Sequence, residues 1–113
     1  MSDVVAGSWS KVTATMNDPR AAAGAVVHQD KLYVAGGNNR AGGSKASLNT
    51  FESFDGTNWE ALPSMQTARS VLGVGALGDH MYAVGGQQTD GFPIQSVEKF
   101  NPSYDCHGGV LHN

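Results

Sequence analysis

The chain has 113 residues, enough for one modest domain, and 40% of them are apolar, which suffices for a small core. Its 7 basic and 10 acidic residues give a net charge of −3 without a basic stripe, so neither nucleic acid nor an anionic membrane surface is expected as a partner. The longest nearly apolar stretch, residues 21–27, is too short to span a bilayer, and the 15 glycines predict many tight turns between short strands.

The N-terminal part of the chain predicts a short lead followed by a strand. Residues 1–8 lack the basic and apolar regions of a secretory signal, and the single Cys106 excludes an internal disulfide. Both features favour a reducing, cytoplasmic location. Residues 9–19 begin with Trp9, and we predict that they form the last strand of a preceding structural unit.

The next segment predicts a β-hairpin. A short apolar run at residues 25–28 is followed by the turn residues 29–31 and by a second β-rich run at residues 32–35. The glycines Gly36 and Gly37 close this run and indicate positive φ angles or a close backbone approach, which side chains would forbid. A polar loop, residues 38–47, follows.

Two further strands complete a four-stranded unit. Residues 49–55 alternate between apolar and polar side chains, which is typical of a half-buried strand. The turn residues 55–58 then lead into a fourth predicted strand, residues 59–62, which Pro63 ends. Four antiparallel strands per unit are the pattern of one propeller blade.

The same pattern recurs 49 residues later, with six identities in 18 aligned positions, among them Arg20 with Arg69 and Tyr33 with Tyr82. A second hairpin is predicted at residues 73–84, and a third strand at residues 96–101. No second match to the fourth strand follows it. The sequence therefore encodes nearly two copies of one unit.

These residues resemble the kelch repeat. Its marks in this chain are the residues Trp9, Tyr33, Gly36, Gly37, Trp59, Tyr82, Gly85 and Gly86, to which we assign structural roles in blade packing, together with Arg20 and Arg69. The resemblance implies an all-β fold, a partial kelch β-propeller of about two four-stranded antiparallel blades. It divides the chain into a lead (1–8), the last strand of a preceding blade (9–19), blade 1 (20–65), blade 2 without its fourth strand (66–104) and a divergent tail (105–113).

In such propellers the loops at one face form the binding surface, so the resemblance implies a protein-protein interaction module. The candidate partner-binding residues are Arg20, Asn38, Asn39, Arg40, Lys45, Arg69, Gln87, Gln88, Asp90 and Phe92. Each arginine has a structural alternative, in which it donates to carbonyl oxygens of a neighbouring blade. The loops have one too, as solvated connectors. Proteins or peptides are the expected partners, and the substrate receptor of a ubiquitin ligase adaptor is one such role.

Neither catalysis nor metal binding is expected. Cys106, His107 and His112 fall short of the four paired ligands of a structural zinc site, and no nucleophile motif or phosphate-binding glycine loop is present. Tyr104 and Cys106 invite comparison with a kelch-fold copper oxidase, but that enzyme's histidine ligands are missing. We therefore expect no enzyme, no metal and no cofactor. A fragment of a kelch-fold enzyme, sugar-processing or oxidase, and a truncated product without independent function stay open as alternatives.

Two blades are too few to close a propeller ring. The chain is therefore expected to need either the remaining blades of a longer propeller or self-association with further copies of itself.

Overall fold

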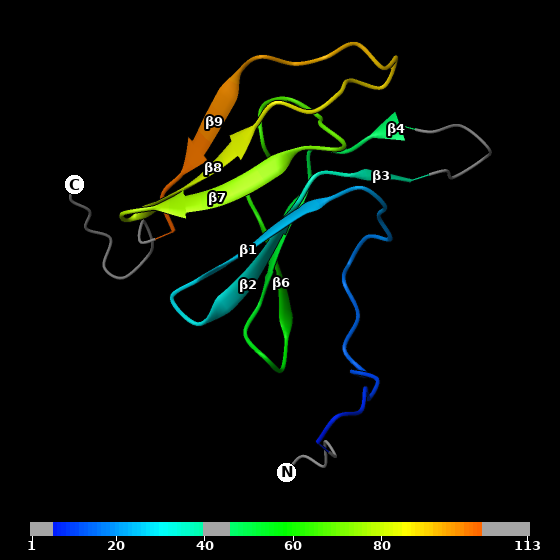
Figure 1. Ribbon diagram of the computed structural model, residues 1–113, viewed down its shortest axis with the longest axis vertical. Helices are drawn as coiled ribbons and strands as arrows, with labels where there is room; N and C mark the ends of the chain where they lie inside the picture. Colours follow the sequence, from blue (N-terminus) through cyan, green and yellow to red (C-terminus); the bar gives the residue numbers. More distant parts are fainter. Residues whose placement is uncertain (1–5, 40–45, 103–113) are drawn as a thin grey trace.

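The computed structural model describes residues 6–39 and 46–102, and its regular elements are all β-strands. They form a four-stranded sheet, a three-stranded sheet and a two-stranded ribbon (Figure 1). Within the described residues, no helix has the length and apolar character that crossing a membrane requires. The all-β fold of two similar units, predicted from the repeat, is confirmed.

The first sheet holds four antiparallel strands in the order β1-β2-β5-β6. Their bounds are β1 (Gly24–His28), β2 (Lys31–Ala35), β5 (Phe51–Phe54) and β6 (Trp59–Leu62). The turn between β1 and β2 places Gln29 and Asp30 at φ angles of 52° and 67°, as a tight hairpin of this hand requires. At the β5–β6 turn, the Asp55 carboxylate accepts hydrogen bonds from the amides of Thr57 and Asn58. All four predicted strands of blade 1 are confirmed.

The second sheet repeats the first three of these strands. It consists of β7 (Gly73–Leu77), β8 (His80–Val84) and β9 (Val97–Phe100), in the order β7-β8-β9. In this sheet β9 stands where β5 stands in the first. Within residues 46–102, no strand pairs with the outer edge of β9.

A two-stranded ribbon interrupts the segment that the sequence predicts as a polar loop. It pairs β3 (Asn38–Asn39) with β4 (Ala46–Ser47), through the partners Asn38 with Ser47 and Asn39 with Ala46. Two residues per strand are too few to show an alternating pattern, so the sequence carried no signal for this ribbon.

The core lies between the two sheets. Tyr33, Ala35 and Phe51 of the first sheet are buried against Met81 of the second, and the Phe51 ring meets the Phe100 ring edge to face at 4.9 Å. Just before β1 and β7 begin, the Val71 amide donates a 2.8 Å hydrogen bond to the Ala22 carbonyl. Each sheet thus covers the apolar face of its neighbour, which is how repeat units stabilise one another.

The aromatic residues that recur in the repeat differ in burial. Tyr33 is buried, and Trp59 is half-buried with its ring stacked on Phe54 at a centroid distance of 4.8 Å. Tyr82, the partner of Tyr33 in the repeat, is only half-buried because the described residues place no further sheet against its side of the second sheet. Trp9 is 100% exposed, and residues 9–19 form no strand, so the predicted packing of Trp9 does not occur in the described chain.

The paired glycines adopt the positive φ angles that the sequence predicts. Gly36 and Gly85 have φ angles of 67° and 64° at matching positions. Their surroundings differ, because a Cβ atom on Gly36 would overlap the carbonyl oxygen of Arg69, which lies in the connection between β6 and β7, whereas one on Gly85 would meet the Ile94 carbonyl oxygen at 3.4 Å.

This difference predicts unequal effects of alanine. Gly85→Ala places a side chain at an unfavourable φ and should cost about 1–2 kcal/mol of unfolding free energy. Gly36→Ala adds an overlap with the Arg69 backbone and should cost about 2–4 kcal/mol in all. Urea unfolding of both variants measures the difference, and equal costs would contradict the close approach of the Arg69 backbone to Gly36.

Candidate functional site

The connections between strands gather at two opposite ends of the sheets. The β3–β4 ribbon and the β8–β9 connection, residues 85–96, lie at one end, and the β1–β2 and β7–β8 hairpin turns lie at the other (Figure 1). The β6–β7 connection, residues 63–72, lies at the first end because β6 ends there and β7 begins there. We call this end, formed by residues 36–39, 46–50, 63–72 and 85–96, the loop face.

Direct hydrogen bonds join the loops of the two sheets into one surface. The Ser47 hydroxyl lies 3.2 Å from the Ser70 hydroxyl and donates to the Gln87 carbonyl at 3.2 Å. The Ser47 amide donates to the Thr89 hydroxyl at 3.1 Å. Since the contacts of Ser47 with Gln87 and Thr89 connect residues 40 and 42 positions apart, the loop face is continuous across the two blades.

The β8–β9 connection presents an aromatic side chain on a tight turn. The Gln88 amide donates to the Phe92 carbonyl at 3.0 Å, the Gly91 amide donates to the Gln88 carbonyl at 2.8 Å, and the Phe92 amide donates to the Asp90 carboxylate at 3.0 Å. These bonds fix the backbone of the turn while the Phe92 side chain stays exposed, at 65%. An exposed aromatic side chain on a fixed backbone loses little conformational entropy when it binds a partner.

A shallow hollow lies beside this turn. Its walls are residues 66–68 from the β6–β7 connection and residues 88–90 from the β8–β9 connection. Apart from Ala68, every lining side chain is an amide, a hydroxyl or a carboxylate. The hollow therefore offers hydrogen-bond donors and acceptors suited to peptide groups or polar side chains.

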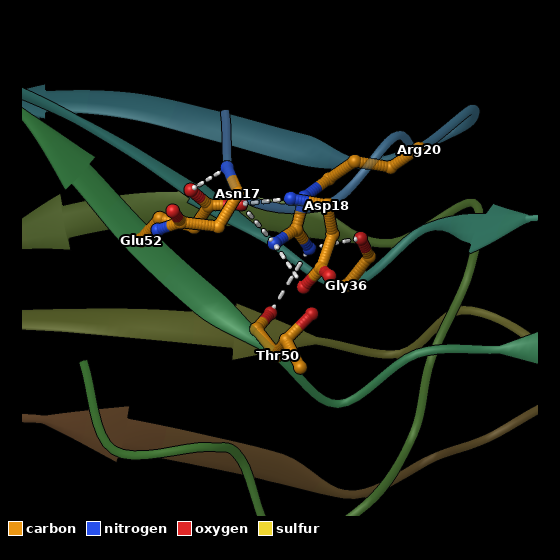
Figure 2. A network of polar contacts seen from close by, with 6 residues as sticks. All are labelled: Asn17, Asp18, Arg20, Gly36, Thr50 and Glu52. Carbon is orange, nitrogen blue, oxygen red and sulfur yellow. Dashed lines mark hydrogen bonds and ion pairs between the residues drawn. The ribbon is translucent and has the colours of Figure 1, made fainter. Parts of the chain in front are cut away.

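A buried arginine holds the base of the first loop (Figure 2). The Arg20 guanidinium donates through Nη1 to the carbonyl oxygens of Gly36 at 2.7 Å and Thr50 at 3.1 Å, and through Nη2 to Glu52 Oε2 at 2.7 Å. The Glu52 carboxylate also accepts the amides of Asn17 at 2.7 Å and Asp18 at 3.2 Å. The Arg20 and Glu52 side chains are 0% and 2% exposed, so this ion pair is shielded from water.

The second blade repeats this network. Arg69 donates to the carbonyl oxygens of Gly85 and Ser96 at 3.0 and 2.9 Å and to Glu98 Oε2 at 2.9 Å. The Glu98 carboxylate accepts the amides of Gln66 and Thr67 at 2.6 and 3.0 Å. In each blade, hydrogen bonds and an ion pair thus connect the residues that precede the first strand, β1 or β7, to the double glycine and to the third strand, β5 or β9.

The environment of the two glutamates lowers their pKa values. Burial by itself would raise the pKa of Glu52, but hydrogen bonds from Arg20, Asn17 and Asp18 favour the carboxylate more strongly, and its pKa falls below the usual value. The same balance, with bonds from Arg69, Gln66 and Thr67, lowers the pKa of Glu98. Both glutamates are therefore ionised at neutral pH and neutralise the arginines beside them.

These networks bear directly on the two arginines proposed as partner-binding residues. Arg20 and Arg69 have side chains that are 0% exposed, so neither guanidinium reaches a partner in this conformation. The carbonyl oxygens that they contact belong to their own blades and not to a neighbouring one. Their observed contacts are those of supports for the loops.

The other predicted partner-binding residues lie at the surface, in the β3–β4 ribbon or outside the described residues. Gln88, Asp90 and Phe92 are exposed, and the exposed Gln87 pairs with Ser70 through its backbone. Asn38 is buried and Asn39 half-buried in β3. Arg40 and Lys45 lie outside the described residues.

Sequence reasoning missed several residues that organise this face. Ser47 and Ser70 link the loops, yet a lone serine in a polar loop carries no distinguishing signal. Glu52 and Glu98 did carry a signal, because both recur in the repeat in step with Arg20 and Arg69. A recurring acidic residue paired with a recurring basic one predicts a repeated ion pair.

No grouping of three or more histidine, cysteine or acidic side chains that could hold a metal ion occurs in residues 6–39 and 46–102. The tail residues Cys106, His107 and His112 lie outside these ranges.

Proteins with similar sequences indicate the family of this chain. A family model described as Kelch motif matches residues 19–66. The chain is similar to Kelch-like protein 41b of Danio rerio, with 34% identity over 93 residues, which is 82% of this chain and 14% of that protein. It is also similar to Kelch repeat and BTB domain-containing protein 13 of Homo sapiens, with 33% identity over 86 residues, 74% of this chain and 18% of that protein.

A third relative is Beta-scruin of Limulus polyphemus, with 31% identity over 96 residues, covering 80% of this chain and 10% of that protein. The chain thus spans less than a fifth of the length of each of these relatives. The matched residues 19–66 contain the four strands of the first sheet, the double glycine Gly36–Gly37 and the Arg20–Glu52 ion pair. The chain belongs to the kelch-repeat family.

Proposed function

We propose that the loop face is a protein-interaction surface that recognises a peptide segment or a partner domain. The observation that carries this proposal is the cross-linking of two polar loops, from different blades, into one surface by Ser47, which contacts Ser70, Gln87 and Thr89. Loops held by a rigid sheet scaffold are where binding residues concentrate in proteins.

The chemistry of this surface favours binding over catalysis. Phe92 supplies an exposed aromatic anchor, and the hollow beside it supplies amide, hydroxyl and carboxylate groups from Gln66, Gln88 and Asp90. An aromatic anchor next to polar groups that can pair with a peptide backbone is the usual composition of a protein-binding site. We assign Arg20 and Arg69 the supporting role of holding the loop bases beneath this surface.

Selection of ligands from a random peptide library displayed on phage, with the full chain as target, tests the proposal. We expect Phe92→Ala to weaken binding of the selected peptides at least about tenfold, because anchor residues dominate such interfaces. The matched control is Leu77→Ala, since Leu77 is also exposed but lies at the opposite end of the sheets. Equal affinities of the native chain and Phe92→Ala, or a loss with Leu77→Ala alone, would refute the assignment.

We further propose that this surface serves a cytoplasmic substrate adaptor of a ubiquitin ligase. The support is the resemblance to kelch propellers that are joined to BTB or F-box domains, together with a relative whose name includes a BTB domain. The single cysteine of the chain supports the location. Co-purification of the native protein with a cullin from cell extract tests this finer role, and its absence would remove the ligase assignment without affecting the loop face.

A further inference from the structure

The outer edges of the third strands differ between the two sheets. In the first sheet, β6 covers the outer edge of β5, with Trp59 opposite Phe54 and Leu62 opposite Phe51. In the second sheet, the described residues place no strand beside the outer edge of β9. An uncovered strand edge is a site at which another strand can pair.

The backbone of β9 is oriented to accept such a strand. The Ser96 carbonyl accepts a hydrogen bond from the Gly85 amide and therefore points inward, toward β8. Because backbone groups alternate in direction along a strand, the amides of Val97 and Lys99 point outward. These are the positions that correspond to Phe51 and Ser53 in β5, which pair with β6.

A mainly apolar cavity, with Gln66 and Glu98 among its polar lining residues, lies on the side of this edge that faces the first sheet. It has a volume of about 140 Å³, and its lining includes Phe51, Met65, Met81 and Phe100. In the first sheet, the Trp59 ring stacks on Phe54 at 4.8 Å with an interplanar angle of 23°. Since Phe100 occupies the position of Phe54, a tryptophan opposite Phe100 on an added strand would enter this cavity.

One segment of the chain has the side chains that the site requires. Trp9 and Val12 have the same spacing as Trp59 and Leu62 in β6. Among the described residues, Trp9 is 100% exposed and Val12 is 56% exposed, so both side chains present apolar surface that could pack elsewhere. A fully exposed tryptophan is an anchor suited to an interface.

The position of this segment keeps it away from β9 of its own copy. Phe51 points from β5 toward the second sheet, so the adjacent Glu52 points away from it. The amides of Asn17 and Asp18 bind Glu52, which fixes the N-terminal segment on the face of the first sheet remote from β9. Figure 1 shows the segment running along the side of the molecule opposite β9.

We propose that residues Trp9–Val12 of a second copy pair with the outer edge of β9 as the fourth strand of its blade. Trp9 then lies opposite Phe100, with its ring in the apolar cavity, and Val12 lies opposite Val97. Each copy donates one strand and accepts one, so association is head to tail. Two copies together hold four blades, the smallest number found in propellers.

Size-exclusion chromatography with light scattering on the full chain tests this assembly. The native chain is expected to have at least twice its 11.8 kDa mass at micromolar concentration. Trp9→Ala removes the anchor of the donated strand, and Lys99→Pro removes an outward amide of the accepting edge, where proline is tolerated. Each variant alone is expected to be monomeric with native circular dichroism.

Mixing the two variants distinguishes strand donation from general stickiness. The Trp9→Ala copy still accepts a strand and the Lys99→Pro copy still donates one, so the mixture should recover a heterodimer. Leu77→Ala, which removes another exposed apolar side chain, should leave association unchanged. A monomeric native chain, an associated Trp9→Ala variant, no recovery on mixing, or loss of association with Leu77→Ala would each overturn the proposal.

Discussion

We expect Arg20→Ala to lower the free energy of unfolding by about 3–5 kcal/mol, because the substitution leaves a buried carboxylate without its counter-ion. The Glu52 side chain is 2% exposed, so water cannot replace the guanidinium. The carbonyl oxygens of Gly36 and Thr50 lose their donor in the same step. Urea unfolding followed by far-ultraviolet circular dichroism measures the effect.

Two comparisons separate the loss of the ion pair from other causes. Arg69→Ala removes the equivalent group, but the Glu98 side chain is 18% exposed, so water partly solvates it and the cost should be smaller. Combining Arg20→Met with Glu52→Gln removes both charges and should regain part of the stability, because no unpaired ion remains. If the double variant is less stable than Arg20→Ala, the buried charge is not the source of the effect.

Most of the strand pattern follows from short-range features of the sequence. The hairpin at residues 24–35 is encoded by two β-rich runs around Gln29 and Asp30, and the β5–β6 turn by Asp55 and the glycine after it. These signals depend on neighbours along the chain and were sufficient. The repeat then extended the same interpretation to the second sheet.

Features that depend on contacts between distant residues were harder to predict. The β3–β4 ribbon has two residues in each strand, and its position depends on contacts such as the one between Ser47 and Gln87. The recurrence of Trp9 in the repeat predicted packing, but a side chain is buried only where a neighbouring sheet covers it. Sequence similarity identified a unit without showing which neighbour it has.

The loops of the candidate site could be located from the sequence, but the sequence left two roles open for the arginines. Both arginines recur next to the first strand, which is compatible with accessible cations at the loop face and with structural donors to carbonyl oxygens. Their side chains instead turn inward and bind Glu52 and Glu98. That outcome requires a carboxylate on the third strand, close to 30 residues farther along the chain, to fold back beside each arginine.

Phe51→Ala should also destabilise the chain by about 3–5 kcal/mol, because it empties the middle of the interface between the two sheets. The centroid of the Phe51 ring lies 5.8 Å from that of Tyr33 and 4.9 Å from that of Phe100. Loss of the ring therefore weakens packing within its own sheet and against the next one. Phe92→Ala is the matched control. It removes the same atoms from an exposed site and should change stability by less than about 0.5 kcal/mol.

The form of the Phe51→Ala transition tests the link between the two blades. Units of a repeat protein derive much of their stability from the interface with their neighbours, so weakening that interface should separate their unfolding. In a Trp9→Phe background, Trp59 is the single tryptophan and reports on the first sheet by fluorescence, whereas circular dichroism reports on both sheets. We expect these two signals to coincide in the native chain and to diverge in Phe51→Ala. Coincident transitions with an unchanged midpoint would show that the two sheets do not stabilise each other through Phe51.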